Sequence, residues 1–134
     1  MLPAYIDHIG IAVKNLDASI NFYEKVLGLK CHKIEEVKDQ KVRTAIFKLG
    51  ESKIELLETT EPDGPIGRFI KDNGEGIHHI AFAVNDVQEA LNEVKSKGIS
   101  LVDNVPRKGA EDLNIAFLHP KATYGVLMEF CSEK

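Results

Sequence analysis

The sequence predicts an α+β protein of two tandem βαβββ modules whose strands form a curved mixed sheet. The first observation is an internal repeat: His-Ile-Gly-Ile-Ala-Val at residues 8–13 returns 71 positions later as His-Ile-Ala-Phe-Ala-Val at 79–84. The second is that Ile-Glu-Leu at 54–56 returns 74 positions later as Met-Glu-Phe at 128–130. The third is that hydrophobic periodicity runs from strand to helix to further strands in each half. Such repeats indicate that one structural unit is used twice.

The first module covers about residues 4–60, and each of its elements follows from local pattern. Residues 6–13 alternate between apolar and small or polar side chains, which predicts a strand. A helix is expected to begin at Asn15, to carry apolar residues at helical spacing and to end at Gly28. Three further strands are expected at 31–37, 42–49 and 53–57, the last two joined as a hairpin by the turn at 50–51.

The second module, about residues 76–132, repeats this order. A strand is expected at 77–84, followed by a helix at 87–97 that ends at Gly98. Three more strands are expected at 101–102, 114–118 and 126–131. The connector, about 61–75, holds a Pro- and Gly-rich breaker cluster, a short helix at 66–71 and a turn. We expect it to lie inside one domain that spans residues 1–134.

Composition narrows the class of protein. With 134 residues, 43% hydrophobic and 28% charged, the chain is typical of a soluble globular domain. A net charge of −4 gives no support for nucleic-acid binding, and no apolar run approaches the length of a membrane span. Cys31 and Cys131 are too few for a disulfide framework. We therefore expect reduced thiols and a cytoplasmic location.

Two histidines and two glutamates predict a shared metal site. Along their strands, His8 and His79 share a face with only Gly and Ala, while the large apolar residues point the other way toward the helices. The same alternation turns Glu55 and Glu129 away from the core. Carboxylates buried without partners are costly, so a cation is expected to neutralise this face. The ligand set alone suits a borderline-to-hard divalent ion and singles out none. The alternative is that the strand histidines are hydrogen-bonded structural residues, as we expect for His78 and His32.

Three segments carry a family resemblance. They are Ile-Asp-His-Ile-Gly-Ile-Ala-Val at 6–13, Gly-Ile-His-His-Ile-Ala-Phe at 76–82, and Ile-Ala-Phe-Leu-His-Pro-Lys at 115–121, which leads into Gly-Val-Leu-Met-Glu at 125–129. The paired modules and these segments together resemble the vicinal oxygen chelate superfamily. That superfamily includes glyoxalase I, extradiol dioxygenases, antibiotic-resistance proteins and methylmalonyl-CoA epimerases. The three segments in this order are most similar to the epimerase family.

The resemblance implies the vicinal oxygen chelate fold, with the sheet curved around a metal-binding cleft. Carried over by position, it makes His8, Glu55, His79 and Glu129 the metal ligands. It favours Co²⁺ or Mn²⁺ as the ion, with Zn²⁺ or Ni²⁺ as alternatives. It also implies a coenzyme A thioester as substrate and a homodimer as the assembly.

The implied reaction interconverts the (R) and (S) forms of methylmalonyl-CoA by removal of the C2 proton through a metal-stabilised enolate. Glu129 is the carboxylate expected to move the proton, and Lys121 is expected to meet the coenzyme A phosphates, with Arg107 and Lys108 as weaker candidates. One position departs from the family: Thr44 stands where some epimerases carry a second acid/base glutamate.

Two other functions stay open from the sequence. A glyoxalase I-type lactoylglutathione lyase would use the same metal and a similar intermediate. A resistance-type protein would instead hold a small molecule in the same cleft without catalysis. Four intact ligand positions argue against the second alternative, and the His-Pro-Lys segment argues against the first.

Overall fold

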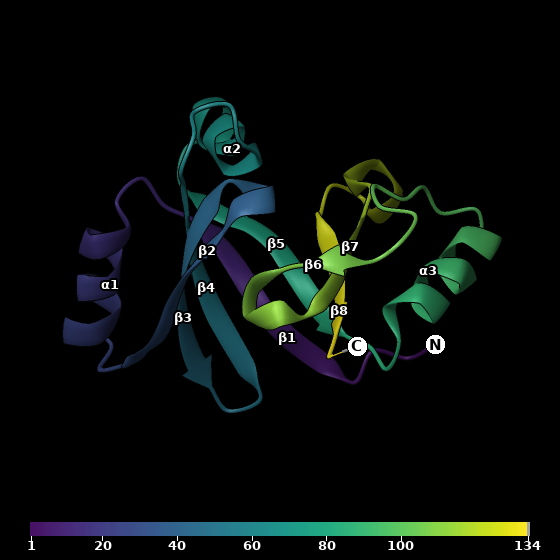
Figure 1. Ribbon diagram of the computed structural model, residues 1–134, viewed down its shortest axis with the longest axis horizontal. Helices are drawn as coiled ribbons and strands as arrows, with labels where there is room; N and C mark the ends of the chain where they lie inside the picture. Colours follow the sequence, from purple (N-terminus) through teal and green to yellow (C-terminus); the bar gives the residue numbers. More distant parts are fainter. Residues whose placement is uncertain (134) are drawn as a thin grey trace. The chain divides into compact units, whose positions relative to one another are not determined.

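The elements follow one another as the two modules predict. The computed structural model describes residues 1–133. In the first module the order is β1 (Tyr5–Ala12), α1 (Leu16–Lys25), β2 (Cys31–Val37), β3 (Val42–Leu49) and β4 (Ser52–Thr59). After α2 (Pro65–Asn73) the second module runs β5 (Gly76–Ala83), α3 (Val87–Ser96), β6 (Arg107–Lys108), β7 (Asn114–Leu118) and β8 (Met128–Ser132) (Figure 1). Short 3₁₀ turns η1 (Lys38–Gln40), η2 (Ala110–Asp112) and η3 (Pro120–Thr123) complete the described chain. The predicted α+β class is confirmed.

The chain divides into two compact units whose boundaries cut through strands β1 and β5. One unit is residues 9–78, and the other joins residues 1–8 to the chain from His79 onward. The beginning of β1 therefore belongs to the unit that holds most of the second module, and the beginning of β5 belongs to the unit of residues 9–78. In the part of the chain that the structure describes, no helix is long and apolar enough to cross a membrane.

The unit of residues 9–78 carries strands in the order β2-β3-β4-β1. β2 with β3, and β3 with β4, are antiparallel, the second pair as the expected hairpin. Helix α1 begins at Leu16, which is fully buried and packs with Phe47 and Leu56. The apolar face of the first strand thus lies under a helix, as its alternation predicts.

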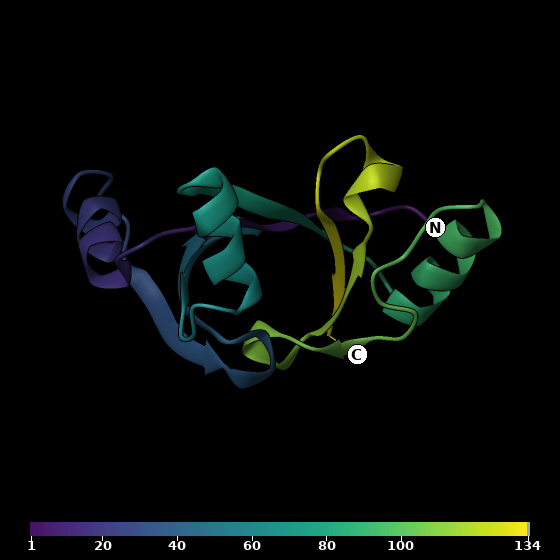
Figure 2. The same cartoon turned by 90° about the horizontal axis from the view of Figure 1, so that it is seen from above.

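The other unit carries strands in the order β1-β5-β8-β7-β6. β5 and β8 are parallel, whereas β8 with β7 and β7 with β6 are antiparallel, which makes this a mixed sheet. Helix α3 covers one face, where Val87 and Leu91 pack with Phe130 and Leu118 (Figure 2). Because side chains alternate along a strand, the neighbours of Phe130 point to the opposite face. One of those neighbours is Glu129.

Both modules turn from strand to helix with the same hydrogen bonds. An Asx side chain caps each helix by accepting a backbone N–H three residues on: Asn15 from Ala18 and Asp86 from Glu89. A backbone N–H after the first strand donates to the last strand of the module, over 2.9 Å in both: Val13 to Leu57 and Val84 to Cys131. These equivalent positions keep the offsets of 71 and 74 residues read from the sequence. The repeat is therefore structural as well as sequential.

One strand differs from the prediction. Leu101 makes only an isolated bridge to Leu118, and the edge strand lies instead at Arg107–Lys108. The cause is local: the Asp103 carboxylate accepts the Phe117 N–H over 2.9 Å, so a side chain takes up a donor of β7 that a longer strand would have used. The strand at this edge of the sheet, β6, therefore has only 2 residues.

Candidate metal centre

Three of the four predicted ligands lie together. His8 on β1, His79 on β5 and Glu129 on β8 come from three strands that are neighbours in the sheet order. Their ligand atoms all lie within 4.8 Å of one another. The two histidine Nε2 atoms are 3.0 Å apart. Glu129 Oε1 is 3.2 Å from His79 Nε2, and Glu129 Oε2 is 3.6 Å from His8 Nε2. Register explains the meeting, because β5 and β8 run parallel with Ala81 opposite Glu129.

The cluster is almost completely removed from water. Its three side chains belong to residues that are only 3–6% exposed. Burial by itself would raise the pKa of Glu129, but the charge of His8 and the hydrogen bonds from His79 and His8 outweigh it and lower the pKa to about 2. The carboxylate is therefore ionised at neutral pH. Two imidazole nitrogens and one carboxylate oxygen directed at the same point are a donor set that fits a divalent cation.

An aromatic side chain packs against the cluster. Phe117 meets the His79 ring edge to face, with centroids 5.5 Å apart and planes at 83°. Phe117 also packs with Ala81, Ile115 and Cys131. The low exposure of the three ligand residues strengthens electrostatic interactions inside the site. The sequence indicated the small residue Ala81 beside His79, but not the aromatic ring that β7 contributes.

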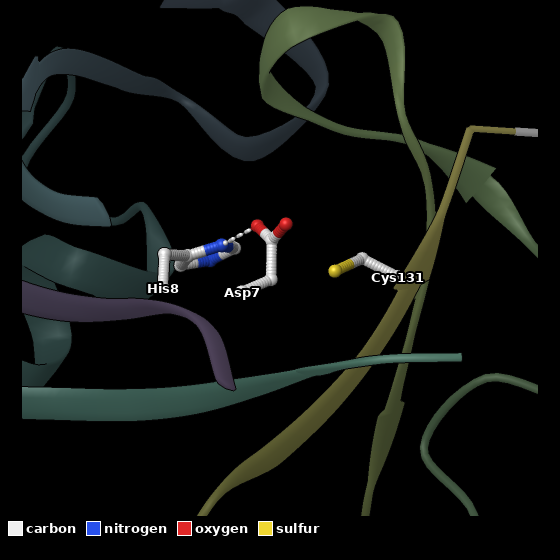
Figure 3. Close-up of side chains that lie close together, drawn as sticks. All are labelled: Asp7, His8 and Cys131. Carbon is white, nitrogen blue, oxygen red and sulfur yellow. Dashed lines mark hydrogen bonds and ion pairs between the residues drawn. The ribbon is translucent and has the colours of Figure 1, made fainter. Parts of the chain in front are cut away.

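The carboxylate of Asp7 contacts the other nitrogen of His8, a contact the sequence analysis missed. Asp7 Oδ2 lies 2.8 Å from His8 Nδ1, and both residues are buried. Figure 3 shows the Asp7 carboxylate between His8 and Cys131, whose thiol points toward it. Consecutive strand residues normally point to opposite faces, so alternation argues against such a pair. The only signal in the sequence is that an acidic residue directly precedes the histidine.

Glu55, the fourth predicted ligand, is buried on β4 opposite Ile46 of β3. It belongs to the unit of residues 9–78, whereas the three clustered ligands belong to the other unit. Its role as a ligand stays a prediction. Thr44, also in that unit, is buried and its hydroxyl donates to the Glu35 carbonyl over 3.1 Å. The hydroxyl thus links β3 to β2. A threonine also offers no carboxylate for proton transfer.

The predicted coenzyme A contacts occupy the second module. Lys121 is exposed in η3, and its backbone N–H donates to His119 Nδ1 over 3.1 Å. Its role stays a prediction. The two weaker candidates are engaged locally: Arg107 stacks over Phe117 at 5.6 Å, and Lys108 Nζ donates to the Asp112 carbonyl over 3.3 Å.

The histidines assigned a structural role, and the thiols, behave as ordinary residues. His78 packs edge to face against Phe69, with centroids 5.0 Å apart, inside the unit of residues 9–78. His32 is exposed on β2. Cys31 and Cys131 are not joined in a disulfide.

The whole chain is similar to known proteins. A family model described as the Glyoxalase/Bleomycin resistance protein/Dioxygenase superfamily matches residues 7–117. An uncharacterized protein of Bacillus subtilis is 43% identical over 129 residues, which cover 96% of this chain and 92% of that protein. The mitochondrial methylmalonyl-CoA epimerase of Dictyostelium discoideum is 34% identical over 125 residues, covering 92% of this chain and 75% of its own. A solved structure of a methylmalonyl-CoA epimerase with methylmalonyl-CoA and ammonium matches with a TM-score of 0.95 at 39% identity, covering 98% of this chain and 95% of the other.

Proposed function

Because the chain belongs to the Glyoxalase/Bleomycin resistance protein/Dioxygenase superfamily, we propose that it is a metal-dependent epimerase that interconverts the (R) and (S) forms of methylmalonyl-CoA. It is an enzyme of the epimerase type, as its similarity to methylmalonyl-CoA epimerases over 92% of its length indicates. The observation that carries the proposal is the buried cluster of His8, His79 and Glu129. This cluster supplies an anionic, cation-binding centre in a chain of that family.

His8, His79 and Glu129 would hold the cation, with Glu55 as the fourth ligand. A divalent ion bound there would supply a Lewis acid where negative charge develops on the thioester oxygen. Two neutral imidazoles and the single carboxylate of Glu129 leave a divalent ion with a net positive charge, which suits an anionic substrate, whereas an ionised Glu55 would cancel that charge. Co²⁺ and Mn²⁺ accept such mixed nitrogen and oxygen ligands, and so do Zn²⁺ and Ni²⁺.

The reaction requires that the C2 proton be removed from one face and returned to the other. Glu129 is the group that we assign to proton transfer, because it is an ionised carboxylate within the cluster. A pKa of about 2 makes it a weak base, and bases poised near the working pH transfer protons more efficiently. Thr44 adds no second base, since its hydroxyl is bound to the Glu35 carbonyl.

The substrate class is a coenzyme A thioester, and Lys121 is the residue that we assign to its phosphates. Its ammonium group would act as a point charge from an exposed turn. Lys121→Ala should raise KM for the thioester several-fold and leave kcat unchanged, because the contact is remote from the reacting carbon. Lys25→Ala, at the exposed end of α1, is the matched control. An unchanged KM in both variants would remove Lys121 from the site.

The decisive experiment follows one epimer of methylmalonyl-CoA in deuterated water. Epimerisation by proton removal should introduce deuterium at C2 as the two forms interconvert. Full retention of the original hydrogen during epimerisation would refute proton exchange with a carboxylate base. No turnover of methylmalonyl-CoA, alongside conversion of the methylglyoxal–glutathione adduct, would identify a glyoxalase I-type lyase instead.

A resistance-type binding protein is the remaining alternative. It would bind a small molecule without turning over either substrate, and it would need no metal. A measured metal content near zero, in a protein that binds a small molecule and turns over neither substrate, would favour it. The homodimer and the cytoplasmic location also stay predictions; sedimentation equilibrium tests the first and cell fractionation the second.

A further inference from the structure

His8 uses its two ring nitrogens in different ways. Nδ1 lies 2.8 Å from the Asp7 carboxylate, while Nε2 lies 3.0 Å from His79 Nε2 and 3.6 Å from Glu129. A carboxylate accepts hydrogen bonds and donates none when ionised, so the proton of the ring is drawn to Nδ1. When the ring is neutral, as a ligating histidine must be, its lone pair then lies on Nε2, on the side of the cluster.

We propose that Asp7 is a positioning residue that fixes the tautomer and the orientation of His8 for cation binding. The inference rests on the proposed metal centre and deepens it. A carboxylate that accepts the second N–H of a ligating histidine holds the ring in place and makes its other nitrogen a stronger ligand. Asp7 does not touch the cation itself; it acts through His8.

The internal repeat supports this role independently. Position 78 corresponds to position 7 at the offset of 71 residues, and His78 stands there. His78 packs against the Phe69 ring, so the equivalent strand forms without any carboxylate at this place. A buried carboxylate carries a desolvation cost, and Asp7 is only 8% exposed. The strand can therefore form without a carboxylate at position 7, and the contact with His8 is what gives Asp7 a role there.

Cys131 suggests a competing interpretation. Figure 3 draws Asp7, His8 and Cys131 close together. Their ligand atoms also lie within 4.8 Å of one another, so these residues could hold a second cation. Two contacts argue against that site. His8 Nδ1 is already engaged by Asp7 at 2.8 Å, and the Cys131 thiol donates to the Phe82 carbonyl at 3.7 Å. The orienting role uses the same atoms without displacing either contact.

The test measures cation affinity and ligand-field spectrum separately from turnover. Co²⁺ is titrated by calorimetry into the metal-free wild type and into Asp7→Ala and Asp7→Asn, and the visible absorption of bound Co²⁺ is recorded. We expect Asp7→Ala to bind Co²⁺ about 10–100-fold more weakly, the usual effect of losing such a partner. Asp7→Asn keeps the size of the side chain and one acceptor oxygen, so its Co²⁺ affinity should lie between those of the wild type and Asp7→Ala. The Co²⁺ absorption bands should shift in the same order.

His78→Asn and Cys131→Ala are the matched controls. The first changes the residue at the repeat-equivalent position, and the second removes the third member of the competing group. Both should bind Co²⁺ with wild-type affinity and at one ion per chain. Two ions per chain in the wild type, reduced to one in Cys131→Ala, would overturn the positioning role in favour of a second site.

The outcomes separate this inference from the proposed function. A wild type that binds no Co²⁺ would refute the metal centre, and with it the role of Asp7. A wild type that binds Co²⁺ and epimerises methylmalonyl-CoA, with equal affinity in both Asp7 variants, would overturn this inference alone. If Asp7→Ala fails to fold, Asp7→Asn decides, and unchanged affinity and spectrum in that variant overturn the proposal.

Discussion

Replacing Glu129 by glutamine separates its two assigned roles. The change keeps an oxygen at the position 3.2 Å from His79 Nε2 but removes the charge and the ability to accept a proton. A positioned general base contributes about 10²–10⁴-fold to rate, and efficiency falls as its pKa moves away from the working pH. We expect a loss of at least about 10²-fold, because glutamine cannot accept the proton. That loss corresponds to ~2.7 kcal/mol of activation free energy.

Glu55→Gln is the comparison variant. Glu55 is a buried glutamate at the repeat-equivalent position, and glutamine keeps an oxygen ligand there. We therefore expect Glu55→Gln to keep its metal and most of its activity. Epimerisation is measured at equal metal occupancy for both variants, because a lost ion would mimic a lost base. Deuterium uptake at C2 during the same assay reports proton transfer directly.

Equal activity of the two glutamine variants, with metal in place, would refute the reasoning for Glu129. Glu129 would then be a ligand only, in agreement with its low pKa. The proton would have to be moved by another group. The strand around Thr44 would become the first place to look.

Four further predictions follow from the same geometry. His8→Ala or His79→Ala should lose about one divalent ion per chain by elemental analysis; a metal-free but fully active variant would contradict the site. In the metal-free protein the pKa of the Glu129 carboxyl should lie far below its usual range, because the charge of His8 and the hydrogen bonds from His79 and His8 outweigh burial; a carbon-13 NMR titration of that carboxyl tests this, and an ordinary pKa would contradict it. Replacing Tyr124 by glycine should raise the free energy of unfolding by ~1 kcal/mol, because this 99% exposed residue has a φ of 60°, a conformation that favours glycine. A lower Tm in this variant would contradict the prediction. Leu91→Ala, in the buried face of α3, should cost about 2–5 kcal/mol by urea unfolding, and a loss below ~1 kcal/mol would contradict its place in the core.

The sequence by itself determined the order of elements and three members of the cluster. Alternation along residues 8–13 and 79–84 separates the helix-covered face from the histidine face, and this pattern is local to each strand. The repeat then relates Glu129 to Glu55 and requires both modules to fold alike. Helix starts at Asn15 and Asp86 are local too, since each cap bonds to a backbone N–H three residues away.

Only the tertiary structure decided what surrounds the ligands. The Asp7–His8 contact joins neighbours that alternation sends to opposite faces, so no pattern of period two predicts it. The Phe117 ring reaches His79 because β7 pairs with β8 in a particular register, and register depends on contacts far apart in the chain. The strand predicted at 101–102 is reduced to an isolated bridge because the Asp103 side chain takes up a β7 donor. Local periodicity determines which face a side chain points to, whereas its partners on that face depend on which strands pair.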